Sequence, residues 1–139
     1  MSGFAKGFQR KNCAGFGVCC GCIDGMLFWT EKPNKLDCKK SECGSGKFFC
    51  GRKKKFGLCF QGVCNSDHKF LDICIKHPAS TSDYLAFLTC SLKYKLEGDG
   101  FLSTGLCLFG DSAYVNNYYM AMPYKKALLG IKDDFNFYH

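Results

Sequence analysis

Two aspartates in this 139-residue chain each follow a short, continuous apolar run. Asp24 closes the run at residues 17–23, and Asp111 follows the run at 106–109 after a single glycine. Such runs are typical of strands buried on both faces, so we expect each aspartate at the C-terminal end of a strand. If the two strands lie parallel and are joined by a right-handed crossover, both carboxylates face one site at one edge of the sheet.

Paired carboxylates at a sheet edge suggest a site for a divalent cation. Like charges repel, and a hard cation such as Mg²⁺ or Mn²⁺ relieves the repulsion by taking oxygen ligands. Two ions about 4 Å apart can activate water and stabilise the leaving oxygen in phosphodiester cleavage, and a third carboxylate normally helps to hold them. Asp83 is a candidate for this role, although an acid there also suits a helix N-terminus. An aspartate after a strand is also common as a turn former or helix cap.

A hairpin is the first element expected between the two aspartates. Residues 56–61 and 71–76 both alternate apolar with small or polar side chains, as strands do. Residues 65–68, Asn-Ser-Asp-His, tolerate the backbone of a tight turn. The pattern predicts two antiparallel strands joined by this turn.

A helix is expected next, because leucines recur there at steps of three and four residues. Ser80 or Ser82 can cap its start, Asp83 suits its positive end, and residues 98–100, Gly-Asp-Gly, supply a left-handed stop. The leucines of this predicted stripe are Leu85, Leu88, Leu92 and Leu96.

Residues 32–52 are polar and hold neither a strand nor a helix period, which predicts a long surface loop. The loop ends in the densest basic segment of a chain whose formal net charge is +7. Clustered cations either keep a loop solvated or bind phosphates by releasing counterions. The candidate phosphate-binding residues are Arg52, Lys53, Lys54 and Lys55.

Twelve cysteines would indicate disulfides in a secreted chain, but residues 1–11 are polar and basic and do not form a secretion signal. No run reaches the roughly 18 apolar residues of a membrane span. We therefore expect a soluble nuclear or cytoplasmic protein with free thiols. Cys19 and Cys22 have zinc-like spacing, and a structural zinc module completed by Cys38, Cys43 and Cys50 is an alternative interpretation.

Several spaced motifs together resemble the nuclease domain of harbinger (PIF-type) transposases, which are DDE superfamily endonucleases. The resemblance covers residues 17–139 and implies a ribonuclease H-like fold, a Mg²⁺ or Mn²⁺ site, and strand cleavage and transfer on DNA. It also implies that Asp24 and Asp111 are the first and second acidic ligands. The motifs are GCIDG at 21–25, residues 56–67, LDICI at 71–75, HPASTSD at 77–83 and LFGDSAY at 108–114.

The sequence departs from the family pattern at several points. The family's third acid, a helical Glu, has no counterpart, since no Glu follows Glu97. Ala79 stands where the family commonly has Gly, and Cys59 where a more polar residue is usual. The sixteen residues before the first motif are expected to be an N-terminal tail, shorter than the family's usual DNA-binding region. These departures predict a truncated or degraded copy.

The expected fold is therefore α/β: a mixed ribonuclease H-like sheet with a crossover helix, incomplete at its C-terminus. The expected function is that of a transposase-derived, metal-binding DNA endonuclease domain that is inactive alone because its third carboxylate is missing. A non-catalytic relic that binds DNA or protein is the main alternative. DNA is the expected partner, with a separate DNA-binding protein or a full-length transposase relative as further candidates, and no membrane.

Overall fold

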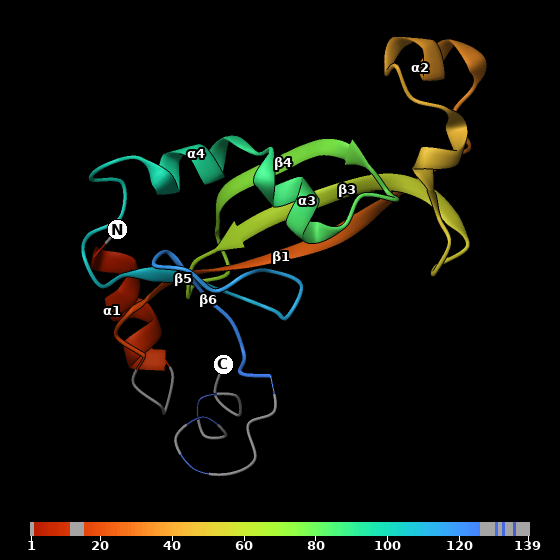
Figure 1. Ribbon diagram of the computed structural model, residues 1–139. Coiled ribbons are helices and arrows are strands. Elements are labelled where there is room, and N and C mark those ends of the chain that lie inside the picture. The colour runs from red at the N-terminus through yellow and green to blue at the C-terminus, as the bar shows by residue number, and fades with distance from the viewer. Residues whose placement is uncertain (1, 12–15, 126–129, 131, 133–134, 136–139) are drawn as a thin grey trace.

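The computed structural model shown in Figure 1 describes residues 2–11, 16–125, 130, 132 and 135. A mixed sheet forms its centre, with one helical segment over the sheet and another at its end (Figure 1). The elements in chain order are α1 (Ser2–Lys11), β1 (Cys19–Thr30), α2 (Lys35–Lys40), the 3-10 helix η1 (Ser45–Phe48), β2 (Phe49–Cys50), β3 (Lys55–Cys64), β4 (Phe70–Pro78), α3 (Asp83–Leu88), α4 (Ser91–Glu97), β5 (Cys107–Gly110) and β6 (Met120–Ala121).

The sheet contains six strands within the described residues, in the order β2-β3-β1-β5-β6, with β4 also paired to β3. β1 pairs antiparallel with β3 and parallel with β5, and β5 pairs parallel with β6. The helical connection α3–α4 links β4 to β5. The expected mixed α/β sheet is confirmed, and its topology fits a ribonuclease H-like endonuclease fold.

The predicted hairpin is present as the antiparallel pair β3 and β4. Asn65 closes its turn, because its Oδ1 accepts the backbone N–H groups of Asp67 at 2.9 Å and of Lys69 at 3.0 Å. His68 takes a left-handed backbone conformation, with φ of 59°. The residue types that favour tight turns therefore indicated this connection correctly.

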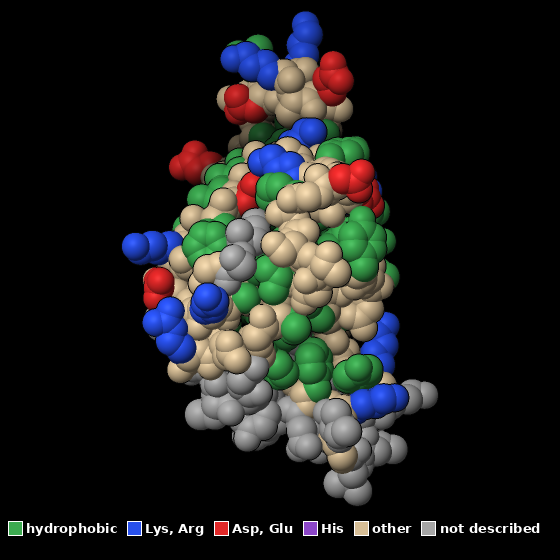
Figure 2. Space-filling view, turned by 90° about the vertical axis from the view of Figure 1, so that its left-hand side faces the viewer, with side chains coloured by type: hydrophobic (Ala, Val, Ile, Leu, Met, Phe, Trp, Pro, Cys, Tyr) green, Lys and Arg blue, Asp and Glu red, His purple; other side chains and the backbone are tan. Residues whose placement is uncertain are grey.

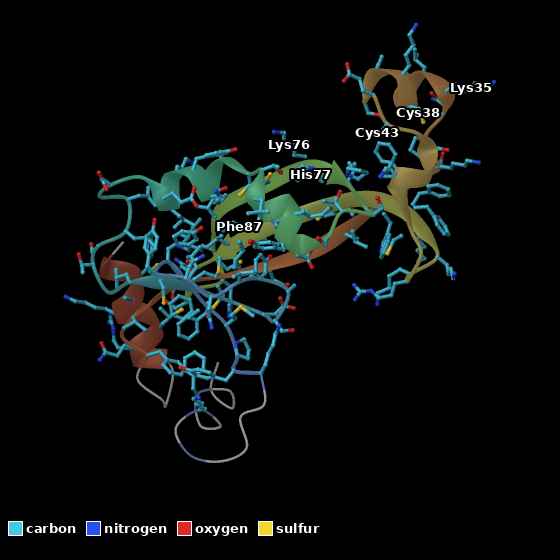
Figure 3. All side chains as sticks on the ribbon, in the orientation of Figure 1. Lys35, Cys38, Cys43, Lys76, His77 and Phe87 are labelled. Carbon is cyan, nitrogen blue, oxygen red and sulfur yellow. The ribbon has the colours of Figure 1, made fainter. Side chains whose placement is uncertain are left out.

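The prediction of one continuous helix is wrong: the chain forms two short helices, α3 and α4. The break lies at Thr89 and Cys90, and Cys90 has the extended backbone of an N-cap. This break rotates α4 relative to α3, so the leucines do not form one buried stripe. Leu92 and Leu96 are buried, whereas Leu85 is 56% exposed. Phe87, and not Leu85, is the residue of α3 that points toward the sheet and packs in the core (Figure 3).

The expected end of the first strand is also wrong, because β1 continues through Asp24 to Thr30. β5 ends at Gly110, which pairs with Ile23, but β3 accompanies β1 to its last residue. β1 therefore does not turn at Asp24, because β3 still pairs with its backbone up to Thr30. Asp24 therefore lies within a strand, at the point where that strand loses one of its two neighbours.

The expected loop at 32–52 is partly structured. Residues 31–48, here called the arm, hold α2 and η1 and project from the end of β1 (Figure 1). Asn34 and Asp37 form a reciprocal capping box that starts α2, although no residue of this helix is buried. Figure 2 shows the arm at the top of the molecule with both acidic and basic side chains. Hydrophobic periodicity could not reveal α2, because capping and not burial supports it.

The main core lies between the sheet and the α3–α4 segment. Its members come from β1, β3, both helices, β5 and the segment after β5, and the most deeply buried are Cys20, Leu108 and Met120. The opposite face of β1, β3 and β4 leaves large apolar side chains exposed, including Met26, Phe28 and Phe70. The N-terminal segment, expected only as a tail, forms α1 and buries Ala5.

Candidate metal centre

Asp24 and Asp111 lie side by side where the parallel pairing of β1 and β5 ends. Cys22 pairs with Phe109 and Ile23 pairs with Gly110, so each aspartate is the next residue after the last pair. Neighbouring strands lie about 4.8 Å apart, which places the two backbones side by side at this point. The expected parallel pairing of the two strands is therefore present, but Asp24 lies within its strand and not at its end.

Backbone N–H groups orient both carboxylates. Asp24 Oδ1 accepts a hydrogen bond from the Gly25 N–H at 2.7 Å. Asp111 Oδ1 accepts one from the Ala113 N–H at 2.8 Å, an interaction typical of an Asx turn. Asp111 thus also serves as a turn former. Both residues are exposed at the sheet edge, so their carboxylates are accessible to an ion.

Asp83, at the N-terminal end of α3, lies against Gly25, the residue after Asp24. Its carboxylate packs directly over Gly25, where any side chain would overlap it. Burial raises the pKa of Asp83, and the negative charges of Asp24 and Asp111 raise it further, while Arg52 opposes the change. The three predicted acidic residues therefore influence one another electrostatically, and of the three only Asp83 is seen to pack against Gly25.

Gln61 is a buried polar residue of β3 that contacts the segment carrying Asp83. The Gln61 side chain, 4% exposed, donates from Nε2 to the Asp83 backbone oxygen and to the Tyr114 hydroxyl, the latter at 3.3 Å. Within the described part of the chain, Gln61 Oε1 is buried without a hydrogen-bond partner. Burial and the three aspartates together raise the pKa of Tyr114, so its hydroxyl remains protonated at neutral pH. Gln61 links β3 to the segments that carry Asp83 and Asp111.

Cys59 adds a thiol to the same environment. Its Sγ donates a weak hydrogen bond to Asp83 Oδ1 at 4.0 Å. Burial and the charge of Asp83 raise the pKa of Cys59 to about 11, which keeps the thiol protonated at neutral pH. A protonated thiol is a poor metal ligand, so Cys59 belongs to the supporting surroundings of the acids.

The donor chemistry fits a hard divalent cation. Carboxylate oxygens are the ligands that Mg²⁺ and Mn²⁺ prefer, and a cation would remove the mutual repulsion that raises the pKa of Asp83. Among the described residues, no three Asp, Glu, His or Cys side chains are close enough together to enclose an ion. The register of β1 and β5 places the backbones of Asp24 and Asp111 side by side, and Asp83 packs over the neighbouring Gly25.

The predicted phosphate-binding residues lie near these acids. Arg52, Lys53 and Lys54 occupy the turn between β2 and β3, and Lys55 begins β3. Arg52 and Lys53 line a cavity of about 560 Å³ together with Asp83. The influence of Arg52 on the pKa of Asp83 shows that the cationic turn and the acidic edge act on each other.

The cysteines proposed for a zinc module lie in different parts of the molecule. Cys19 and Cys22 are in the first part of β1, whereas Cys38 and Cys43 lie on the arm beyond the other end of that strand (Figure 3). Eight residue steps along β1 lead from Cys22 to Thr30, a distance of roughly 26 Å at the usual rise per residue. The structure does not bring the five sulfurs of this alternative together.

Sequence reasoning did not identify Gln61, Tyr114 or Trp29 as parts of this region. Gln61 gave a usable signal, since it is a lone amide among the apolar and small residues of β3. Tyr114 follows Asp111 by three residues but has no distinctive pattern of its own. Trp29 looked like an ordinary strand residue, and only the folded chain shows that it lines the cavity.

Residues 23–136 match the family described as DDE superfamily endonuclease, and the chain belongs to this family. No curated protein and no solved structure matches the chain. Endonucleases of this superfamily act on DNA and generally use divalent metals. No helix in the part of the chain that the structure describes is both long enough and apolar enough to cross a membrane.

Proposed function

We propose that this chain is a harbinger-type, transposase-derived endonuclease domain that binds Mg²⁺ or Mn²⁺ through Asp24 and Asp111. The observation that carries the proposal is the parallel pairing of β1 with β5, which ends next to both carboxylates. Asp83 packs over Gly25, and its pKa is raised by burial first and by the charges of Asp24 and Asp111 second; a cation would neutralise the charge contribution. Nuclear localisation follows from the proposed DNA substrate.

In this proposal the acidic residues bind the metal ion and the basic residues bind the DNA. Asp24 and Asp111 hold the ion, and their hydrogen bonds to backbone N–H groups keep the carboxylates oriented. A bound divalent ion supplies activation of water and stabilisation of the leaving phosphate oxygen. The cationic turn that begins at Arg52 attracts the DNA backbone toward this edge.

We further propose that the isolated chain binds metal and DNA without cutting. The family's third acid is a Glu, and no Glu follows Glu97 in this sequence. A full-length transposase relative is a suitable source of this acid, and such a partner would then be required for cleavage. The expected activity of residues 1–139 tested by themselves is therefore binding without cleavage.

Metal binding is the direct test. Titration of Mn²⁺ followed by electron paramagnetic resonance should show binding to the wild type and its loss in Asp24→Asn and Asp111→Asn. Asp99→Asn is the matched control, since Asp99 is an exposed acid in the loop after α4 and is not among the charges that influence Asp83. Equal Mn²⁺ affinity in all four proteins would refute the site.

A non-catalytic binding relic is the second candidate, favoured by the absence of a third acid close enough to complete a ligand set within the described residues. It predicts salt-dependent binding to duplex DNA without nicking in Mg²⁺ or Mn²⁺. Cleavage by the purified chain, lost in Asp111→Asn, would exclude this candidate and also our proposal that the chain needs a partner.

A further inference from the structure

A cavity of about 560 Å³ adjoins the acidic edge and is not explained by metal binding. Its walls are the outer part of β1, the turn after β2 and the loop that leads into α3. We call it the Trp29 groove. Its volume lies within the roughly 300–1,000 Å³ typical of small-molecule sites. Its lining includes Gly25, Trp29, Arg52, Lys53, Ser82 and Asp83.

Trp29 is the only tryptophan of the sequence and is 46% exposed in this groove. It pairs with Gly57 across β1 and β3, and a side chain on Gly57 would clash with the backbone oxygen of Phe28 and lie 3.3 Å from Trp29 Cε3. The absence of a side chain at Gly57 therefore leaves room for the Trp29 indole. An exposed, positioned indole provides a flat surface for stacking.

Cations surround the indole. Lys55 Nζ lies 5.5 Å from the centre of the Trp29 ring, and Arg52 and Lys53 line the same groove. Asp83 lies in the lining as well and connects the groove to the acidic edge. Positive charge beside an aromatic surface suits a ligand that has both a phosphate and a planar ring, which are the two parts of a nucleotide.

The strand edge beside the groove is also open. β5 stops opposite Ile23, so within the described residues β1 is paired only with β3 from Asp24 to Thr30. Unpaired backbone N–H and C=O groups on this edge can form hydrogen bonds with the polar edge of a base. A base in a duplex is already stacked and paired, so this combination of groups favours an unpaired nucleotide.

We propose that the Trp29 groove binds an unpaired nucleotide of the DNA strand whose phosphate lies at Asp24 and Asp111. The base stacks on Trp29, and Arg52 and Lys53 contact its flanking phosphates. This inference rests on the proposed endonuclease function. It adds a preference for strand ends or distorted sites over continuous duplex.

Intrinsic fluorescence tests the proposal directly, because Trp29 is the chain's only tryptophan. The probes are a single-stranded DNA of about 15 nucleotides, an abasic strand of the same length and the corresponding duplex, all in EDTA. The single strand should quench the fluorescence and bind more tightly than the duplex. The abasic strand should bind through its phosphates with little quenching. No quenching by the single strand at saturation would overturn the proposal.

Variants separate stacking from charge. Trp29→Ala should weaken single-strand binding about tenfold, measured by anisotropy of a labelled strand, and Trp29→Phe should retain most of the affinity. The double variant Arg52→Ser, Lys53→Ser should weaken binding to all three probes and reduce its salt dependence. The controls are Phe70→Ala, an exposed aromatic outside the groove, and Lys39→Ser with Lys40→Ser on α2. Wild-type affinity in Trp29→Ala would overturn the stacking role.

The groove and the metal site can fail independently. In EDTA the single strand should still quench the wild type, although no Mn²⁺ is then bound. Quenching in a wild type that binds no Mn²⁺ would support the groove and reject the metal site, and the reverse result would reject the groove alone. An acidic polypeptide that quenches Trp29 as strongly as the single strand would assign the groove to a protein partner and overturn the proposal.

Discussion

The two parts of β1 have different support. From Cys19 to Ile23 the strand has β3 or β5 pairing, and its buried side chains enter the main core. From Gly25 to Thr30 its partner among the described residues is β3 alone, and the strand leads into the arm, whose helix α2 buries no residue. The acidic residues lie where these parts meet, and the Trp29 groove belongs to the outer part. The strand segment before Asp24 is therefore anchored by the core, whereas the Trp29 groove lies on the outer part.

The inner part should give the largest loss of stability. Leu108→Ala removes a side chain that is 1% exposed, so we expect a loss of about 3 kcal/mol in the free energy of unfolding. Leu36→Ala on the arm, where Leu36 is 59% exposed, should change it by less than about 0.5 kcal/mol. Urea denaturation measures both. Similar losses at the two positions would remove the distinction between core and arm.

A glycine in the outer part should have the next largest effect. Gly57→Ala forces a side chain against the Phe28 backbone and the Trp29 ring, and overpacking of this kind costs about 2 kcal/mol. Quenching of Trp29 by single-stranded DNA should also decrease, while Mn²⁺ binding persists. Gly44→Ala is the control, since open space surrounds that position. An unchanged melting temperature in Gly57→Ala would contradict the close packing.

Metal binding should stabilise the junction of the two parts. At ten times its dissociation constant, Mn²⁺ should add about 1.4 kcal/mol to the free energy of unfolding, because it binds the folded chain alone. The rise in melting temperature should disappear in Asp111→Asn and remain in Asp99→Asn. Chelation with EDTA should reverse it. A rise that survives in Asp111→Asn would place the metal elsewhere in the molecule.

Asp83→Asn should give the smallest effect, and one that depends on pH. The pKa of Asp83 is raised in the folded state, so its ionisation destabilises the fold. This cost is absent below the unfolded pKa of about 4, grows as pH rises through the raised folded pKa, and is then constant. The asparagine variant should therefore be more stable than wild type at neutral pH, by on the order of 0.5 kcal/mol after solvent screening, and equal at low pH. Thermal melts across this range without metal test the sign.

The elements that depend on short-range sequence features were predicted best. Asn65 and its neighbours identified the hairpin turn, and the apolar runs before Asp24 and Asp111 identified two strands of the sheet. The helical segment was located correctly, but its break at Cys90 was missed, because the spacing of the leucines is compatible with one helix. α2 was missed because two capping side chains support it and no buried stripe does.

The amino-acid order alone indicated candidate metal ligands and predicted that their two strands belong to one mixed sheet, since residue types and apolar runs act locally; the pairing of these strands is confirmed. It also indicated the family to which residues 23–136 belong. Only the tertiary structure decided that Asp83 packs over Gly25 and that Trp29 shares a cavity with Arg52. These contacts depend on where β5 stops beside β1 and on how the turn after β2 folds back. The register of the strands and the path of the turn after β2 depend on packing throughout the fold. Short-range sequence patterns therefore do not predict them.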